Sequence, residues 1–160
     1  MNFQRRPRRL SQGGMTLLEL IIACSILLIL SSAALPLVRM VVVREREKEL
    51  RQNLREIRDA IDRYKDYADR NLIRQKADSE GYPPDLETLV QSVHLGGSGY
   101  DRKVRFLRRI PLDPMTGRAE WGLRSVQDDQ DSSSWSGSNV FDVYSKSAGI
   151  ALDGTRYSDW

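Results

Sequence analysis

The chain has 160 residues, of which 40% are hydrophobic and 29% charged, and a formal net charge of +3. The first fourteen residues carry four arginines and no acid, and without them 21 basic side chains face 22 acidic ones. This near-neutral remainder argues against a nucleic-acid-binding protein. The single cysteine, Cys24, and the single histidine, His94, exclude an intramolecular disulfide and a Cys/His metal cluster. No catalytic constellation is present in the sequence, so we expect no enzyme.

The junction between the basic leader and a long apolar segment is the most informative feature. Residues 20–38 are nineteen consecutive positions without a charge, about the length of helix that spans a bilayer. The small residues Gly13 and Gly14 precede this segment, whereas the cleavage site of an ordinary secretory signal follows its hydrophobic region. Cleavage at these glycines would remove the leader and leave the apolar helix on the mature protein.

This pattern resembles the class III signal of type IV pilins and of the pseudopilins of type II secretion. The resemblance implies cleavage after Gly14 by a prepilin peptidase and methylation of the new N-terminal residue, Met15. Glu19 then takes the fifth mature position, where the family has a glutamate, and Pro36 takes the twenty-second, where a proline is common. It also implies a single-pass protein of the bacterial inner membrane with its C-terminal domain in the periplasm.

The apolar segment leads without a linker into a second helical pattern. We therefore divide the chain into a cleaved leader at 1–14, a transmembrane and assembly helix at 15–43, and an amphipathic continuation at 44–76. Pro36 is expected to kink the helix, and Glu47 and Arg51, four residues apart in the favourable order, are expected to pair. The apolar stripe that should seat the globular domain consists of Leu50, Leu54, Ile57, Ile61, Tyr64 and Ala68.

Residues 77–160 are expected to form a periplasmic globular domain with a small antiparallel sheet. The expected elements are a helix at 86–93 capped by Asp85, an extended segment at 104–110, and strands at 119–126 and 139–145. Phe141 and Val143 should share one face of the last strand. The polar loop 127–138 joins the two strands, and the tail carries three expected anchors, Leu152, Tyr157 and Trp160. The predicted fold class is α+β, with a long transmembrane and amphipathic helix packed on this domain, as in type IV pilins.

The C-terminal half resembles the major, G-type pseudopilin of type II secretion. The matching pieces are Tyr82-Pro83, 110–114 (IPLDP), 142–145 (DVYS) and the segment 152–160. The resemblance implies a bound calcium ion in the C-terminal loop, with Asp153 and Asp159 as candidate ligands, because calcium prefers six to eight oxygen ligands. Residues 145–149 have no acid where the family commonly has one. The alternative is that these are solvated loop acids.

The resemblance implies a structural subunit that assembles from the inner membrane into a helical fibre and drives protein export. The implied partners are other copies of the chain, the prepilin peptidase, the inner-membrane secretion platform, minor pseudopilins and the lipid bilayer. In the fibre, Glu19 would pair with the methylated N-terminal amine of a neighbour. Two alternatives remain: a minor pilin of a type IV pilus or competence system, and a membrane-anchored periplasmic sensor or binding domain. The latter leaves Gly14, Glu19 and Pro36 unexplained.

Overall fold

The computed structural model describes residues 16–74, 79–96, 102–129 and 131–160, except for the side chains of 33–37. The chain divides into two compact units, Met1–Val41 and Val42–Trp160. Helix α1 (Leu17–Asp69) is continuous in the backbone through both. The surroundings of Pro36 lie outside the described residues, so its predicted kink stays a prediction.

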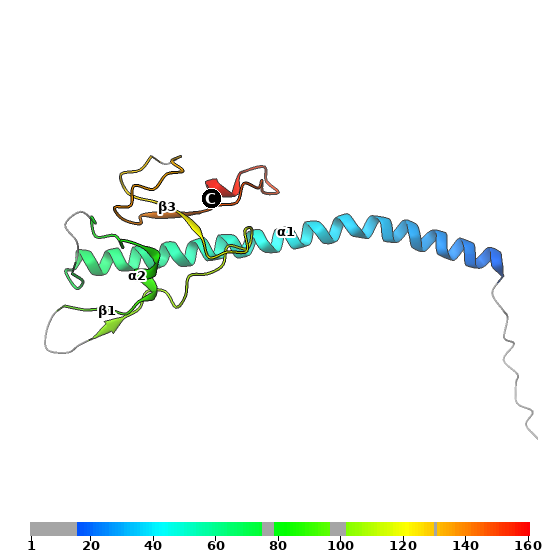
Figure 1. The fold of residues 1–160 in the computed structure, drawn as a ribbon. Helices are drawn as coiled ribbons and strands as arrows, with labels where there is room; N and C mark the ends of the chain where they lie inside the picture. Colours follow the sequence, from blue (N-terminus) through cyan, green and yellow to red (C-terminus); the bar gives the residue numbers. More distant parts are fainter. Residues whose placement is uncertain (1–15, 75–78, 97–101, 130) are drawn as a thin grey trace, which may run out of the picture. The chain divides into compact units, whose positions relative to one another are not determined.

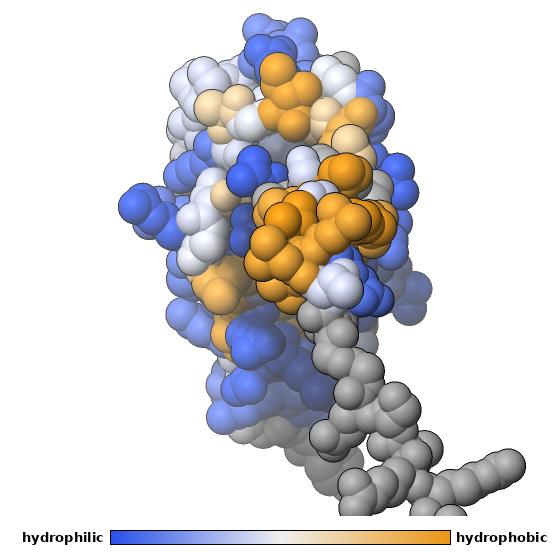
Figure 2. All heavy atoms as spheres, turned by 90° about the vertical axis from the view of Figure 1, so that its right-hand side faces the viewer, coloured by the Kyte–Doolittle hydropathy of each residue, from blue (hydrophilic) through white to orange (hydrophobic). Residues whose placement is uncertain are grey.

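In the first unit, α1 exposes apolar side chains around its whole circumference. Its large hydrophobic residues between Leu17 and Val41 are 47–76% exposed wherever they are described. Figure 2 views the molecule from the end at which α1 begins and shows apolar side chains, in orange, on the surface. A helix that is apolar on every side requires a non-aqueous cover.

Within the described ranges, no helix has the combined length and apolarity needed to cross a membrane.

In the second unit, α1 carries the core of the globular domain. The predicted apolar stripe is confirmed, because all six of its residues are buried, with exposures of 0–6%. The helix ends at Asp69 and not at residue 76 as predicted. Asn71 adopts a left-handed conformation, with φ 56°, and its amide donates to Ala68 O at 2.9 Å, while Leu72 N donates to Tyr67 O at 3.0 Å. These two bonds form a Schellman motif that satisfies the last carbonyls and ends the helix.

Two small antiparallel sheets flank this part of α1 on opposite sides (Figure 1). The first pairs β1 (Val93–His94) with β2 (Lys103–Val104). The second pairs β3 (Trp121–Arg124) with β4 (Asp142–Ser145), so that Trp121 lies opposite Ser145. A short helix, α2 (Leu86–Val90), precedes the first sheet, and a 3-10 turn, η1 (Tyr157–Asp159), follows the second. The predicted α+β fold, a long N-terminal helix with a small antiparallel β region, is confirmed.

The segment expected to be extended over 104–110 is a strand only at its first residue. The amides of Phe106 and Leu107 both donate to Leu89 O, at 3.1 and 2.9 Å. These bonds turn the chain across the end of α2 and bury both side chains. Phe106 packs edge-on against Tyr64 and Tyr67, with ring centroids 5.4 Å apart in each pair. Helix α2 is one turn shorter than expected because Val93 pairs in β1, whereas its predicted cap, Asp85, does accept from Thr88 N at 2.7 Å.

Two expected core positions at the C-terminal end are wrong. Phe141 is 48% exposed and lies just before β4, so only Val143 of the expected pair is buried. Leu152 is 50% exposed, and its neighbour Ala151 is buried instead. The cause is a backbone bond, because Leu152 N donates to a Glu47 carboxylate oxygen at 2.8 Å and the side chain faces solvent. Tyr157 is buried, as expected.

Candidate functional site

The N-terminal turn of α1 carries Glu19, the predicted assembly residue. Gly14 and Met15, the predicted processing residues, lie outside the described residues. Thr16 Oγ1 accepts a hydrogen bond from Glu19 N at 3.2 Å, and Thr16 O accepts from Leu20 N at 3.1 Å. Thr16 is therefore the N-cap of α1. Its spacing to Glu19 is that of the capping box, in which a Ser or Thr is followed three positions later by Glu or Gln.

Glu19 has a role in the isolated chain that the sequence reasoning missed. A carboxylate in the first helical turn interacts favourably with the unsatisfied amides at the positive end of the helix. The signal was visible as Thr-Leu-Leu-Glu before an apolar run. The neighbours Leu18 and Leu20 are 67% and 47% exposed, so Glu19 is a single acid at the rim of an apolar surface. Such a group can bind a cation wherever that surface becomes covered.

The apolar surface behind Glu19 contains few polar groups. Ser25 Oγ donates to Ile21 O at 2.7 Å, one turn earlier, and thereby satisfies its own hydroxyl within the helix. Cys24 is exposed and carries a free thiol. The described side chains from Leu20 to Ser32 thus offer a surface suited to a lipid tail or another apolar helix, and not to water.

A second cluster holds the C-terminal segment against α1. Glu47 accepts from Leu152 N at 2.8 Å and from the Tyr157 hydroxyl at 3.2 Å. Arg51 Nη2 lies 3.2 Å from an Asp153 carboxylate oxygen, and its guanidinium lies 4.0 Å from the centroid of the Trp160 ring. Glu47 and Arg51 therefore bind the tail, whereas the sequence had suggested that they pair with each other.

Arg58, two turns further along α1 than Arg51, joins β4 to the end of the chain. Its Nε donates to Asp142 Oδ1 at 2.7 Å, and its Nη2 donates to Val143 O and Trp160 O at 3.0 and 2.9 Å. One planar guanidinium thus binds a side chain, a strand carbonyl and the last residue. No sequence signal pointed to Arg58, because its partners are 84 to 102 positions away.

The two predicted calcium ligands do not form a shared metal site. Asp153 binds Arg51 through one oxygen and accepts from the Thr155 hydroxyl and amide with the other, at 2.6 and 3.0 Å. The Thr155 bonds, with the Arg51 charge, hold the pKa of Asp153 below its usual value. Arg156 Nε donates to Asp159 Oδ2 at 3.2 Å.

No group of three or more His, Cys, Asp or Glu side chains within the described ranges is arranged to hold a metal. Two carboxylates, each already neutralised by an arginine, do not fit a calcium ion. Calcium binding stays an untested prediction.

The polar loop between β3 and β4 is organised by one of its own acids. Asp128 Oδ2 accepts from Ser125 N at 2.8 Å and from Ser136 N at 3.3 Å. These bonds, the Ser125 amide first, lower the pKa of Asp128. Trp135 Nε1 donates to Asn139 O at 2.8 Å and holds the returning strand. These hydrogen bonds give the loop a defined conformation.

Comparison with known proteins adds one finding. Residues 9–35 match the family described as the prokaryotic N-terminal methylation motif. The matched segment contains the predicted processing junction at Gly14, the capping residue Thr16 and Glu19.

Comparison with curated proteins found no match, and comparison with solved structures found none. The family match covers 27 of the 160 residues and is confined to the N-terminal segment.

Proposed function

We propose that this protein is a structural subunit of a type II secretion pseudopilus, of the major pseudopilin class. One observation carries the proposal: a methylation motif at 9–35 leads into α1, whose exposed residues 20–32 are uncharged and follow one acid, Glu19, in the first turn. A soluble domain does not need such a helix, and the acid lies where a neighbouring cation could reach it.

The apolar surface explains how one chain serves two states. Each large aliphatic side chain that leaves water contributes about 1.5–3 kcal/mol. A bilayer can cover this surface before assembly, and neighbouring copies of α1 can cover it in a fibre. The leader with its arginines would be removed first, so that only the apolar helix enters the fibre.

Glu19 would restrict the fibre to arrangements in which its carboxylate has a cationic partner. In an isolated chain it lies exposed at the helix end, where its charge is favourable. In a bundle of apolar helices an unpaired carboxylate costs several kcal/mol. The amine of a processed Met15 on a neighbouring copy is a suitable partner, because it is a cation at the same apolar rim. Pairing therefore favours one register between copies.

The tail supports this proposal over a minor pilin of a pilus or competence system, which shares the N-terminal motif. The C-terminal segment is held on α1 by Glu47, Arg51 and Arg58, and needs no disulfide. Its pieces 110–114 and 152–160 resemble those of the major pseudopilin. These features favour the secretion system.

Neutralising Glu19 tests the proposal. Glu19→Gln keeps a residue that suits the third position of a capping box but removes the charge, so helix α1 and membrane levels should be preserved. Crosslinked ladders of the protein in cells, and secretion, should be lost. Glu45→Gln is the matched control, because Glu45 is an exposed acid of α1 and contacts only Lys48. Normal ladders from Glu19→Gln would contradict an assembly role.

A further inference from the structure

A dense run of cations lies on one flank of the second unit. Five of the eight residues from 102 to 109 are exposed bases: Arg102, Lys103, Arg105, Arg108 and Arg109. For none of them does the described part of the chain contain an ion pair, whereas Arg51 and Arg58 of α1 each bind an acid. Clustered like charges raise the energy of the isolated domain.

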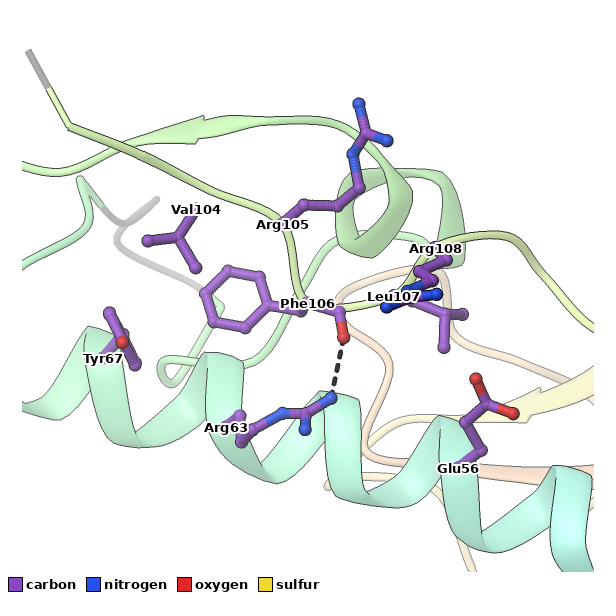
Figure 3. A pocket seen from close by; sticks show the side chains of 8 residues that line it. All are labelled: Glu56, Arg63, Tyr67, Val104, Arg105, Phe106, Leu107 and Arg108. Atoms are coloured by element: carbon purple, nitrogen blue, oxygen red, sulfur yellow. Dashed lines mark hydrogen bonds between the residues drawn. The ribbon is translucent and has the colours of Figure 1, made fainter.

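The backbone holds these cations in fixed positions. Phe106 and Leu107, between the bases, are 6% and 3% exposed, and their amides are bound to Leu89 O. Arg63 Nη2 donates to Phe106 O at 2.7 Å and ties the segment to α1 (Figure 3). The run is therefore a formed surface, with buried anchors inside and charges outside.

A groove follows this run along α1. One cavity of about 590 Å³ is lined by Glu56, Arg63, Tyr67 and residues 104–108. A second, of about 800 Å³, is lined by Asn53, Glu56 and residues 108–112. The two share Glu56 and Arg108, and Glu56 is the one acid in either lining. We call this surface, residues 102–112 with the facing side of α1, the basic groove. It can accept an extended acidic segment.

The same chain carries a suitable segment on the other sheet. Residues 125–138 contain three aspartates and no basic residue. Asp128 is bound to its own loop, as described above. Asp129 and Asp131 are exposed, and no ion pair for either occurs among the residues that the structure describes. We call the two exposed aspartates, Asp129 and Asp131, the acidic loop.

The two surfaces lie on opposite sides of α1. Arg63 joins α1 to the basic groove, whereas Arg58 joins it to β4, at the base of the acidic loop. The two sheets flank α1 correspondingly in Figure 1. One copy therefore cannot join its own two surfaces, but a row of copies can. Contacts between different patches generate rings or open filaments and not two-fold dimers.

We propose that the basic groove of one subunit receives the acidic loop of the next subunit in the fibre. This inference rests on the proposed fibre function and deepens it, because it names a contact outside the apolar helices. Complementary charge sets the register between neighbours. A row of subunits then has a free basic groove at one end and a free acidic loop at the other. High salt should weaken the contact, since the charges are exposed.

Charge reversal in the full-length protein tests this contact. One variant carries Arg105→Glu and Arg108→Glu, a second carries Asp129→Lys and Asp131→Lys, and a third carries all four. Each pair alone should reduce crosslinked ladders in cells at least tenfold, because like charges then meet. The four changes together should restore them to within about twofold of wild type. Circular dichroism of the detergent-extracted protein checks that each variant is folded.

Reversal at Arg74 and Arg118 is the matched control. Both are exposed, and both lie outside the groove. This control should assemble normally, and equal loss here would overturn the proposal by showing a general effect of charge.

The remaining outcomes also decide the question. Normal ladders from either reversed pair, or no recovery when the pairs are combined, would overturn the proposal. Loss of binding to anionic vesicles by the Arg105 and Arg108 variant, without recovery of ladders in the combined variant, would assign the groove to lipid headgroups instead. Ladders that survive charge reversal but are lost in Glu19→Gln would reject this contact and leave the proposed function standing. No ladder from wild type would reject both.

Discussion

Replacing Arg58 with methionine should loosen the whole C-terminal end of the protein. Methionine keeps the apolar stem of the side chain and removes the guanidinium. The change removes the bonds to Asp142, Val143 O and Trp160 O, and leaves Asp142 with only a longer contact, 3.8 Å from Arg124. Because the Arg58 and Asp142 side chains are 37% and 27% exposed, water partly replaces what is lost.

The magnitude follows from the number and kind of bonds. A hydrogen bond to a charged group contributes about 1.5–3 kcal/mol before any discount for exposure. Bonds that share one donor group are not additive, so we expect a loss of about 2–4 kcal/mol. Arg51→Met is the comparison, because Arg51 and Asp153 are about half exposed. An exposed ion pair and a cation–π contact should together contribute less than the Arg58 bonds.

Hydrogen exchange with mass spectrometry on the detergent-extracted full chain measures the difference. Amides of β4 and of residues 149–160 should exchange about a hundredfold faster in Arg58→Met. They should exchange at most about thirtyfold faster in Arg51→Met, with α2 unchanged in both variants. Equal protection in wild type and Arg58→Met would refute the reasoning that this guanidinium holds the C-terminal end.

Three further predictions concern the globular unit. Gly122→Ala would place a Cβ 2.2–2.5 Å from the Tyr144 ring, so the free energy of unfolding in urea should fall by about 1–3 kcal/mol; an unchanged midpoint would contradict the packing of β3 on β4. Asp128 and Asp153 have lowered pKa values in the folded protein, so their ionised forms stabilise the fold above the unfolded pKa of 3.8. This stabilisation is lost as the pH falls through the lowered folded-state pKa values. Thermal midpoints should therefore drop between pH 4 and the acid limit, and Asp128→Asn should flatten that drop. The thermal midpoint should be the same in millimolar calcium and in chelator. A lower midpoint in chelator would establish a calcium site, which would contribute about 2.7 kcal/mol of stability at a hundredfold excess over Kd.

The long helix and its buried stripe could be predicted because both depend on local periodicity. Spacings of three and four residues placed Leu50, Leu54 and Ile57 on one face, and each is at most 2% exposed. The end of the helix was not predicted because neither a glycine nor a proline marks it. It depends on Asn71, and asparagine is a weaker signal for the left-handed backbone that ends a helix. The capping box at Thr16 was present in the sequence and could have been found.

The arrangement of the C-terminal half could not be predicted because its bonds are long-range. Glu47 and Arg51 are suitably spaced for a helical pair, but both bind groups about a hundred positions away. Phe106 was expected on a strand, yet two amide bonds to Leu89 turn the chain there. Side-chain pattern alone does not reveal which backbone carbonyl a segment will meet.

The intact mass of the protein extracted from membranes tests the central claim most directly. Cleavage after Gly14 and methylation of Met15 underlie the whole account, because only the processed chain presents both an amine and Glu19 at the apolar rim. The account predicts a mature chain that begins at methylated Met15, with Gly14→Ala as a variant that keeps the leader. A protein from peptidase-active cells that still carries residues 1–14 would contradict it.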